Sequence, residues 1–371
     1  MASRSEVATE PPVVAGPTAA RWLAPLRRSV LAAVTEFLDA HCREALYGAH
    51  VDIAELVLRG MLAEGKCVRS TYLYLGWQCG ARPDTAALRA AASLELLHAF
   101  ALLQDDVMDE SSMRRGRPSA HRAFEQWHRE RGLPGSSARF GESAAVLLGD
   151  LCLVWAEQML RESGLAEAAL TRAWPRYDAM RTELAIGQFA DLVNDSAGFP
   201  DFDDVLDVAR RKSGNYTVRR PLEIGAALAG CDEEVMAVLG RYGEAIGEAF
   251  QLRDDLLGVF GAPQTTGKPT GTDLVARKAT TVVVAGYQLA GGVQQRQFKE
   301  FMTAQQLSSD DVARWQSLIS EVGTVQRIED MIHRRFAAAV QALDSLDAAR
   351  LDTDARSALV AMASACTERV A

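Results

Sequence analysis

The 371-residue sequence is poor in the residues that build disulfide frameworks and zinc sites. Its six cysteines are scattered, and neither a CxxC pair nor a Cys/His cluster with zinc-ligand spacing is present. We therefore predict six reduced, core-packed cysteines, and we exclude a disulfide scaffold or a zinc ribbon.

Positive charge is also scarce. Lysine and arginine number 40 against 49 aspartate and glutamate residues, which gives a formal net charge of −9. A protein that binds nucleic acid through its general surface carries a basic excess. We therefore predict no nucleic-acid partner, although this balance leaves room for a local basic pocket.

The N-terminus lacks the basic region and long apolar run that mark a signal peptide or a membrane anchor. It is instead rich in Pro, Ala and Val. We expect residues 1–20 to form a flexible N-terminal segment, and the protein to be cytoplasmic with no integral membrane segment.

Strand-forming sequence is nearly absent after this segment. Ala, Leu, Glu and Arg dominate, and apolar residues recur at three- and four-residue spacing. The β-branched run at residues 280–284 has no partner strand, so we interpret it as helix. With 48% hydrophobic residues the chain can bury a large core. We predict a single all-α domain over residues 21–371, with about ten or more helices.

Two predicted helices, residues 91–103 and 245–257, are apolar on nearly every face, as expected inside a bundle. Both end in acid: Asp105, Asp106 and Asp109 at the first, Asp254 and Asp255 at the second. Carboxylates held near a core repel one another unless cations neutralise them. An isolated Asp-Asp pair is more often a solvated helix end. Two such clusters favour magnesium, which prefers oxygen ligands and is often completed by substrate phosphates.

Short basic groups adjoin these acidic helices. They are Arg114, Arg115 and Arg117 in MRRGRP, Lys66 and Arg69 in GKCVRS, Lys212 in KSGNY, and Lys268 and Lys278 after the second cluster. Each alone would be interpreted as a surface charge. Around two metal-binding clusters, the set predicts a diphosphate site. His98, two turns before Asp105, is either an ordinary core histidine or a phosphate donor.

These motifs resemble those of the trans-isoprenyl diphosphate synthase (polyprenyl synthetase) family. DDVMDESSMRRGRP is similar to its first Asp-rich motif with a basic tail, and FQLRDDLLGVFG is similar to its second. The resemblance runs from about residue 56 to residue 278. It implies a helical bundle around a central cavity, a homodimer, and a magnesium-dependent prenyltransferase. Such an enzyme joins isopentenyl diphosphate head to tail to an allylic diphosphate.

The resemblance also implies a role for each matching residue. Asp105, Asp109 and Asp254 would hold about three magnesium ions, supported by Asp106 and Asp255. The catalytic set would comprise these acids together with Lys212 and Lys268. The allylic diphosphate would contact Arg114, Lys212, Gln251 and Lys268, and isopentenyl diphosphate would contact Lys66, Arg69, His98 and Arg115. Ser213 would also bind substrate. Gln188 and Asp191 of GQFADL would steady the pocket.

Two departures from the family pattern stand out. The family reads GKRxRP where this chain has Cys67 and Ser70, which we expect to weaken isopentenyl diphosphate binding. The third acid of the second motif is Gly258 here, and we expect activity to survive because the first Asp is the main metal contact.

The expected reaction is ionisation of the allylic diphosphate, attack by the isopentenyl double bond, and proton loss to the departing diphosphate. Product length should follow the depth of the apolar pocket. Phe100 and Ala101, five and four positions before Asp105, would form its floor. Two rings there would imply a fifteen-carbon product and no ring a long one, so the single ring implies geranylgeranyl diphosphate.

Several alternatives stay open: a farnesyl or longer-chain synthase, a class I terpene cyclase, or a non-catalytic synthase subunit. Lys66, Arg69 and Arg115 argue against a cyclase, which uses no isopentenyl diphosphate. The nearly complete set of acidic and basic residues argues against a non-catalytic subunit.

Overall fold

The computed structural model describes residues 19–42, 46, 51–197, 199–262 and 270–368. The described residues are 80% helical, so the predicted all-α class with ten or more helices is confirmed. The predicted N-terminal segment lies almost wholly outside the described residues, and the assignment of residues 21–371 to one domain stays a prediction.

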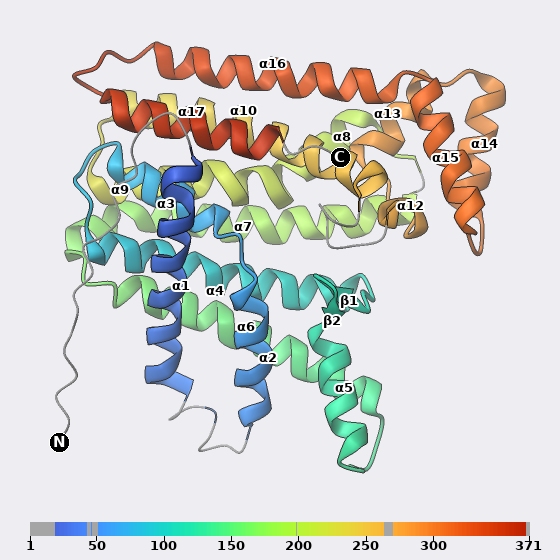
Figure 1. Ribbon diagram of the computed structural model, residues 1–371, viewed down its shortest axis with the longest axis horizontal. Coiled ribbons are helices and arrows are strands. Elements are labelled where there is room, and N and C mark those ends of the chain that lie inside the picture. Colours follow the sequence, from blue (N-terminus) through green and yellow to red (C-terminus); the bar gives the residue numbers. More distant parts are fainter. Residues whose placement is uncertain (1–18, 43–45, 47–50, 198, 263–269, 369–371) are drawn as a thin grey trace.

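The elements follow one another as a long series of helices interrupted by one small hairpin (Figure 1). The first half contains α1 (Ala20–Cys42), α2 (Asp52–Ala63), α3 (Val68–Gln78), α4 (Thr85–Met108), β1 (Met113–Arg114), β2 (Arg117–Pro118), α5 (Ala120–Glu130), α6 (Ser137–Arg161) and α7 (Glu167–Ala197). The second half contains α8 (Phe202–Ala209), the π-helix η2 (Arg210–Arg219), α9 (Arg220–Ala229), α10 (Glu233–Phe260), α12 (Thr272–Val275), α13 (Thr281–Leu289), α14 (Gly292–Thr303), α15 (Ser309–Glu321), α16 (Thr324–Asp344) and α17 (Thr353–Thr367).

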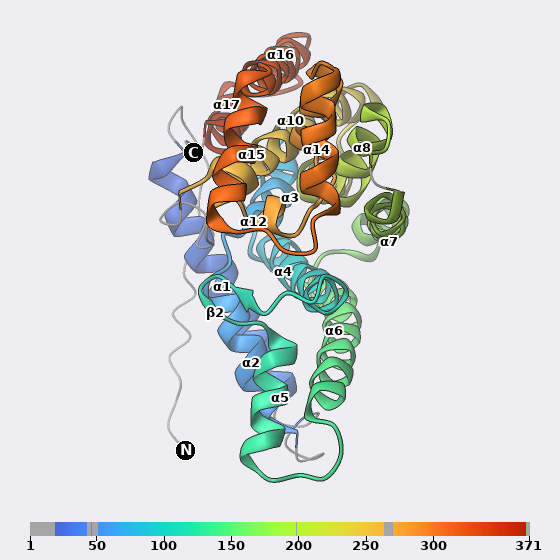
Figure 2. The same ribbon diagram turned by 90° about the vertical axis from the view of Figure 1, so that its right-hand side faces the viewer.

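Several of the long helices run nearly parallel to the longest axis of the molecule. In Figure 1, α16, α10, α7 and α4 lie one below another, whereas α1, α2 and α5 extend towards the bottom of the view. Figure 2 shows the same layers from the end, with α4 in the middle and α14, α15 and α16 at the top.

Two hydrophobic clusters form the core, and α10 contributes to both. Residues of its first half belong to the cluster that also contains residues of α1, α3, α4, α6, α7 and α9, and residues of its second half belong to the cluster that contains residues of α8, α13, α14, α15 and α16. Because α10 spans both clusters, its position is fixed along its whole length.

The acidic end of α4 is held by the burial of the helix that precedes it. Asp84 caps the helix by accepting from the backbone N–H groups of Ala86 at 2.6 Å and Ala87 at 3.1 Å. Between the caps the helix is buried on nearly every face, as its apolar sequence predicts. It ends at Met108, with Asp109 as the C-terminal cap.

The β1–β2 hairpin was not anticipated. Met113 pairs with Pro118 and Arg114 with Arg117, across a turn in which Arg115 (φ 52°) and Gly116 (φ 76°) are both left-handed. Two successive positive φ values are typical of a tight type I′ hairpin. This hairpin folds the basic tail back onto the end of α4.

The helices α4 and α6 are long and apolar enough to cross a membrane by length and composition. The most apolar window of α4 is 67% buried inside the protein and that of α6 is 44% buried. Core helices of large bundles meet the same criterion, and the burial of α4 identifies it as one.

Candidate active site

A cavity of about 1210 Å³ lies between α3, α4, α6, α7, η2 and α10. Asp105 of α4 and Asp254 of α10, the leading acids of the two clusters, both line it. The other predicted site residues that line it are Lys66, Arg69, His98, Phe100, Ala101, Arg114, Arg115, Gln188, Lys212, Ser213 and Gln251. The fold therefore brings most of the predicted site into one cavity.

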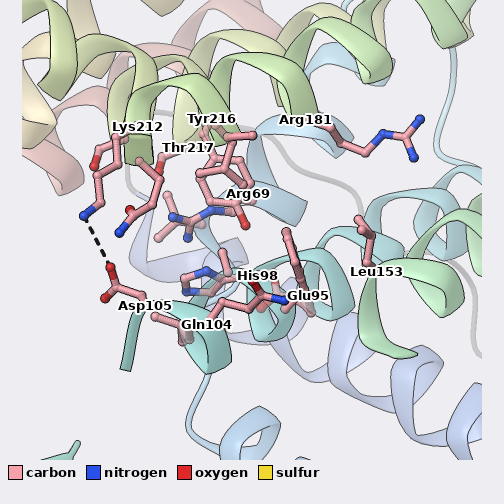
Figure 3. Close-up of a pocket in the computed structure, with 18 of the residues that line it drawn as sticks. Arg69, Glu95, His98, Gln104, Asp105, Leu153, Arg181, Lys212, Tyr216 and Thr217 are labelled. Atoms are coloured by element: carbon pink, nitrogen blue, oxygen red, sulfur yellow. Dashed lines mark ion pairs between the residues drawn. The ribbon is translucent and has the colours of Figure 1, made fainter. Parts of the chain in front are cut away.

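Asp105 lies between two cations. Arg114 Nη2 is 3.2 Å from its Oδ2. Lys212 Nζ is 3.3 Å from its Oδ1, the ion pair drawn as a dashed line in Figure 3. Burial by itself would raise the pKa of Asp105, but Lys212, Arg114 and Lys278 together lower it. Lys212 also donates to Asp191 at 2.5 Å. Asp191, the acid of the GQFADL motif, therefore helps to position Lys212 in the cavity.

Asp106 faces away from this cavity. Arg114 Nε donates to its Oδ1 at 2.9 Å, and its side chain is 1% exposed. Burial outweighs Arg114 and raises the pKa of Asp106 above its ordinary value. Consecutive residues of a helix point about 100° apart, so Asp105 faces the cavity and Asp106 does not.

Asp109 pairs with Lys278, which arrives from the segment after α12. Burial would lower the pKa of Lys278, but Asp109 raises it above its ordinary value. This ion pair joins the end of the first acidic motif to the basic segment after the second. Lys268 lies outside the described residues.

Asp254 and Asp255 have contrasting environments. Asp254 is exposed at the cavity, whereas Asp255 is buried and does not line it. Asp255 Oδ2 accepts from the Thr281 backbone N–H at 3.0 Å and from its hydroxyl at 2.5 Å, and Oδ1 accepts from Gln251 at 2.6 Å. Burial nevertheless raises the pKa of Asp255 to about 7.

An acid from α12 occupies the space beside Gly258. A Cβ atom at Gly258 would lie 1.8 Å from Asp273 Oδ2. The motif lacks its third acid in sequence, but the fold returns a carboxylate to the same place. Sequence reasoning missed Asp273 because its proximity depends on the path of the chain after α10.

The basic side of the cavity offers hydrogen-bond donors to a ligand. Arg69 stacks its guanidinium 4.3 Å above the ring centroid of Tyr216. Among the described residues, neither Arg69 Nε nor His98 Nδ1 has a hydrogen-bond partner, although both are buried. Burial is the main cause that holds the pKa of His98 well below its usual range, and the positive charges of Arg69, Arg115 and Arg114 lower it further. The ring is therefore neutral.

Glu95 is a cavity residue that the sequence prediction did not include. Its carboxylate is buried and accepts from the Ser70 hydroxyl at 2.5 Å. Ser70, which replaces the proline of the family pattern, therefore has a hydrogen-bond partner in the cavity wall. The position of Glu95 three residues before His98 places it on the same helical face, a signal that could have identified it.

In the described part of the chain, four non-glycine residues adopt left-handed backbone conformations: Cys67, Glu110, Arg115 and Arg277. They adjoin Lys66, Asp109, Arg114 and Lys278 respectively. Such conformations cost on the order of 1–3 kcal/mol and concentrate at functional sites. Cys67 and Arg115 line the cavity, and Glu110 and Arg277 adjoin the Asp109–Lys278 ion pair, which agrees with a functional role for these charges.

The π-helix η2 presents Lys212 and Ser213 to the cavity. It approaches α7 and α10 at glycines: a Cβ at Gly187 would lie 2.6 Å from Lys212 N, and one at Gly247 would lie 2.6 Å from Gly214 O. Segments of π-helix are frequent at functional sites. Lys212 therefore reaches Asp105 because small residues let three helices meet closely.

The acids fit a magnesium site of the kind that substrate completes. Within the described ranges, no three His, Cys, Asp or Glu side chains form a ready-made metal cluster. Asp105, Asp109 and Asp254 offer carboxylate oxygens, and magnesium commonly takes one or two of these together with substrate phosphates. The donor chemistry therefore agrees with the predicted metal.

An all-α fold whose cavity gathers carboxylates from two helices opposite several cations defines a helical enzyme that handles anionic substrates. Residues 52–319 match the polyprenyl synthetase family model, and the chain belongs to this family. The family comprises trans-prenyltransferases that make prenyl diphosphates and typically depend on magnesium, so the predicted enzyme class is confirmed.

Individual relatives differ in the product they are named for. The chain is 32% identical to a geranylgeranyl diphosphate synthase of Mycobacterium tuberculosis, over 76% of this chain and 75% of the relative. It is 31% identical to a geranylfarnesyl diphosphate synthase of Aeropyrum pernix, over 67% and 73%. A geranylgeranyl pyrophosphate synthase of Corynebacterium glutamicum, solved with isoprenyl diphosphate and magnesium, superposes with a TM-score of 0.89. It is 36% identical, and the match covers 94% of this chain and 99% of that one.

Proposed function

We propose that this protein is a geranylgeranyl diphosphate synthase that adds isopentenyl diphosphate to a shorter allylic diphosphate. The observation that carries the proposal is the single cavity shared by Asp105 and Asp254, with Lys66, Arg69, Arg114, Arg115 and Lys212 around it. A site that binds two diphosphates needs carboxylates to hold metal cations and basic side chains to bind phosphate oxygens.

Isopentenyl diphosphate would bind Lys66, Arg69, His98 and Arg115. The unpartnered Arg69 Nε and His98 Nδ1 support this assignment. Arg69 Nε is a buried donor that gains from an anionic acceptor, and His98 Nδ1 does so in the tautomer that carries its proton there. The neutral His98 would donate one N–H and carry no charge of its own until a phosphate approaches.

The allylic diphosphate would lie near Arg114, Lys212, Ser213 and Gln251, with Lys268 and Gln188 completing the set. Asp105, Asp109 and Asp254 would hold about three magnesium ions, which would neutralise the departing diphosphate. Lys212 and Arg114 would add fixed positive charge, and these preorganised cations favour the transition state more than the ground state. Asp106 would support Asp105 by holding Arg114, and Asp255 would hold Gln251.

The apolar part of the cavity would protect the allylic cation from water. Phe100, Ala101, Leu153 and Leu184 line it, and they offer no nucleophile. The proton lost after bond formation would go to the departing diphosphate. Phe100, with Ala101 beside it, is the single bulky floor residue on which the twenty-carbon product rests.

The decisive experiment supplies purified protein with magnesium, labelled isopentenyl diphosphate and each of the three short allylic primers. We expect geranylgeranyl diphosphate from all primers that are accepted. A fifteen-carbon or a twenty-five-carbon end product would overturn the chain length, and no transfer from any primer would overturn the activity. Hydrocarbon released from an allylic diphosphate alone would identify a terpene cyclase instead.

We also propose a cytoplasmic homodimer that associates through α6 and α7. Leu147 and Val154 of α6 and Ile186, Phe189 and Val193 of α7 are large, apolar and exposed. Exposed apolar groups of this kind mark association surfaces. Sedimentation of the wild type against Val154→Asp, with Leu289→Asp as an exposed control on α13, should reveal a dimer that only the first variant weakens.

A further inference from the structure

A second cavity of about 220 Å³ lies beside the first acidic motif and is distinct from the substrate cavity. It is enclosed by α2, the end of α4, the β1–β2 hairpin and the start of α5, which are grouped together in Figure 1. Leu56 lines it and is 70% exposed, so the cavity reaches the surface of the molecule. Its volume equals that of about seven liquid water molecules, which suits a small organic ligand.

The walls are mainly apolar, but one wall residue, Asp106, carries an unsatisfied polar atom. Val57, Met61, Leu102 and Ala123 supply hydrocarbon surface. Asp106 also lines the cavity, its side chain is 1% exposed, and its Oδ2 has no hydrogen-bond partner among the described residues. A buried carboxylate oxygen without a partner costs free energy that a donor would recover.

The charges around this oxygen select the kind of donor. Arg114 already bonds Asp106 Oδ1, and Arg117 pairs with Glu64 at 3.1 Å. A further cation would meet Arg114, Arg115 and Arg117, whereas an anion would meet Asp106 and Glu64. A neutral O–H group satisfies Asp106 Oδ2 without either repulsion.

We propose that this cavity binds a small neutral alcohol. Its hydroxyl donates to Asp106 Oδ2, and its hydrocarbon part packs between α2, α4 and α5. Because the ligand is small, its Kd is on the order of 1 mM.

Occupancy of this cavity is coupled to the substrate cavity. Glu64, Leu102, Arg114 and Arg115 line both, and Arg114 bonds both Asp105 and Asp106. A hydroxyl that shares the Asp106 carboxylate changes how tightly this carboxylate holds Arg114. This coupling rests on the proposed function, whereas alcohol binding does not. By reciprocity, a substrate that moves Arg114 changes alcohol affinity by the same factor.

The test titrates 3-methylbutan-1-ol into the full-length protein and observes binding by ligand-detected NMR. The matched probe is its methyl ether, which keeps the hydrocarbon and loses the donor. We expect saturable binding of the alcohol and at least tenfold weaker binding of the ether. Equal binding of the two, or a cavity that holds only ordered water after a crystal soak, would overturn the proposal.

Two substitutions fill the cavity independently. Ala123→Leu does so from α5 and Gly60→Leu from α2, where an added Cβ would meet only Arg117 Nη1, at 3.8 Å. Ala168→Leu, at an exposed site on α7, is the control. Both filling variants should lose alcohol binding at least tenfold, and the control should retain it. Binding that persists in the folded filling variants would assign the alcohol to the substrate cavity and refute the proposal.

Prenyl transfer is measured on the same variants, because neither Gly60 nor Ala123 lines the substrate cavity. Alcohol binding by a protein without prenyl transfer would leave the site standing and overturn the proposed function. Prenyl transfer by a protein that binds no alcohol would support the proposed function and overturn the alcohol site. If alcohol binds but magnesium and isopentenyl diphosphate leave its Kd unchanged, the coupling fails.

Discussion

Asp254 and Asp255 are neighbours in sequence with opposite surroundings, and this contrast carries a pH signature. Asp255 keeps its proton up to about pH 7 in the folded protein, against an ordinary pKa of 3.8. Between these values the folded state binds more protons than the unfolded state, so this group makes the free energy of unfolding fall as pH rises.

Asp255→Asn should remove this contribution in magnesium-free protein. The uncharged amide can accept from Thr281, and Gln251 can rotate to accept from it, so the fold is retained. Denaturant unfolding from about pH 5 to about pH 8 should show the variant gaining stability relative to the wild type as pH rises. The exposed Asp203→Asn is the control, and a variant curve parallel to the wild type would contradict the shifted pKa.

At Gly258, restoring the residue of the family motif is expected to harm the protein. Restoring the family acid with Gly258→Asp should reduce stability by about 1–3 kcal/mol, because Asp273 already occupies the space. Combining it with Asp273→Ala should recover much of the loss. Thermal unfolding and prenyl-transfer rates of both single variants and the double variant measure the coupling. Additive effects would show that the two positions do not share one space.

Phe100 and Ala101 provide opposite tests of product length. Phe100→Ala should lengthen the product, because removing the ring deepens the cavity that both residues line. Ala101→Phe should shorten it to fifteen carbons, because a second ring raises the floor. Product chromatography measures both, and an unchanged length in Phe100→Ala would exclude this ring as the floor.

At the scale of elements, sequence periodicity predicted the helices well where burial enforced them. The β-branched run at residues 280–284 is helical in α13, as expected. Thr280 caps it by accepting from Val283 N at 3.4 Å, and among the described residues no strand pairs with it. The hairpin was missed because Arg115 adopts a positive φ that arginine rarely takes. The π-helix was missed because no periodicity in KSGNY separates it from an α-helix.

Close helix packing around η2 is testable at a single glycine. Gly247→Ala should force η2 away from α10, since the new Cβ would lie 2.6 Å from Gly214 O. We expect a loss of about 1–3 kcal/mol in stability and a lower prenyl-transfer rate, because Lys212 shifts from Asp105. Gly292→Ala, where a Cβ meets nothing within 4 Å, is the control. A fully active Gly247→Ala variant would refute this positioning role.

At the scale of the whole molecule, the two acidic motifs should bind magnesium and diphosphate cooperatively. Lys212 and Lys278 neutralise Asp105 and Asp109 in the structure, so neither magnesium nor pyrophosphate alone should stabilise the protein strongly. Together they should raise Tm by several degrees, since a ligand at a hundred times its Kd adds about 2.7 kcal/mol.

Thermal unfolding with each ligand singly and with both measures this cooperativity. Asp105→Asn and Asp254→Asn should each abolish the excess shift, whereas Asp203→Asn should keep it. Strictly additive shifts in the wild type would contradict a shared metal–diphosphate site.

The sequence by itself determined the helical class, the two acidic motifs and most of the cations, because helical periodicity and charge clusters are local features. Only the tertiary structure decided which neighbours face which space. Asp106 and Asp255 lie behind the cavity wall while Asp105 and Asp254 line it, and Asp273 returns to Gly258 from a separate helix. Such contacts depend on how segments far apart in the sequence pack against one another, and no local pattern of residues encodes that packing.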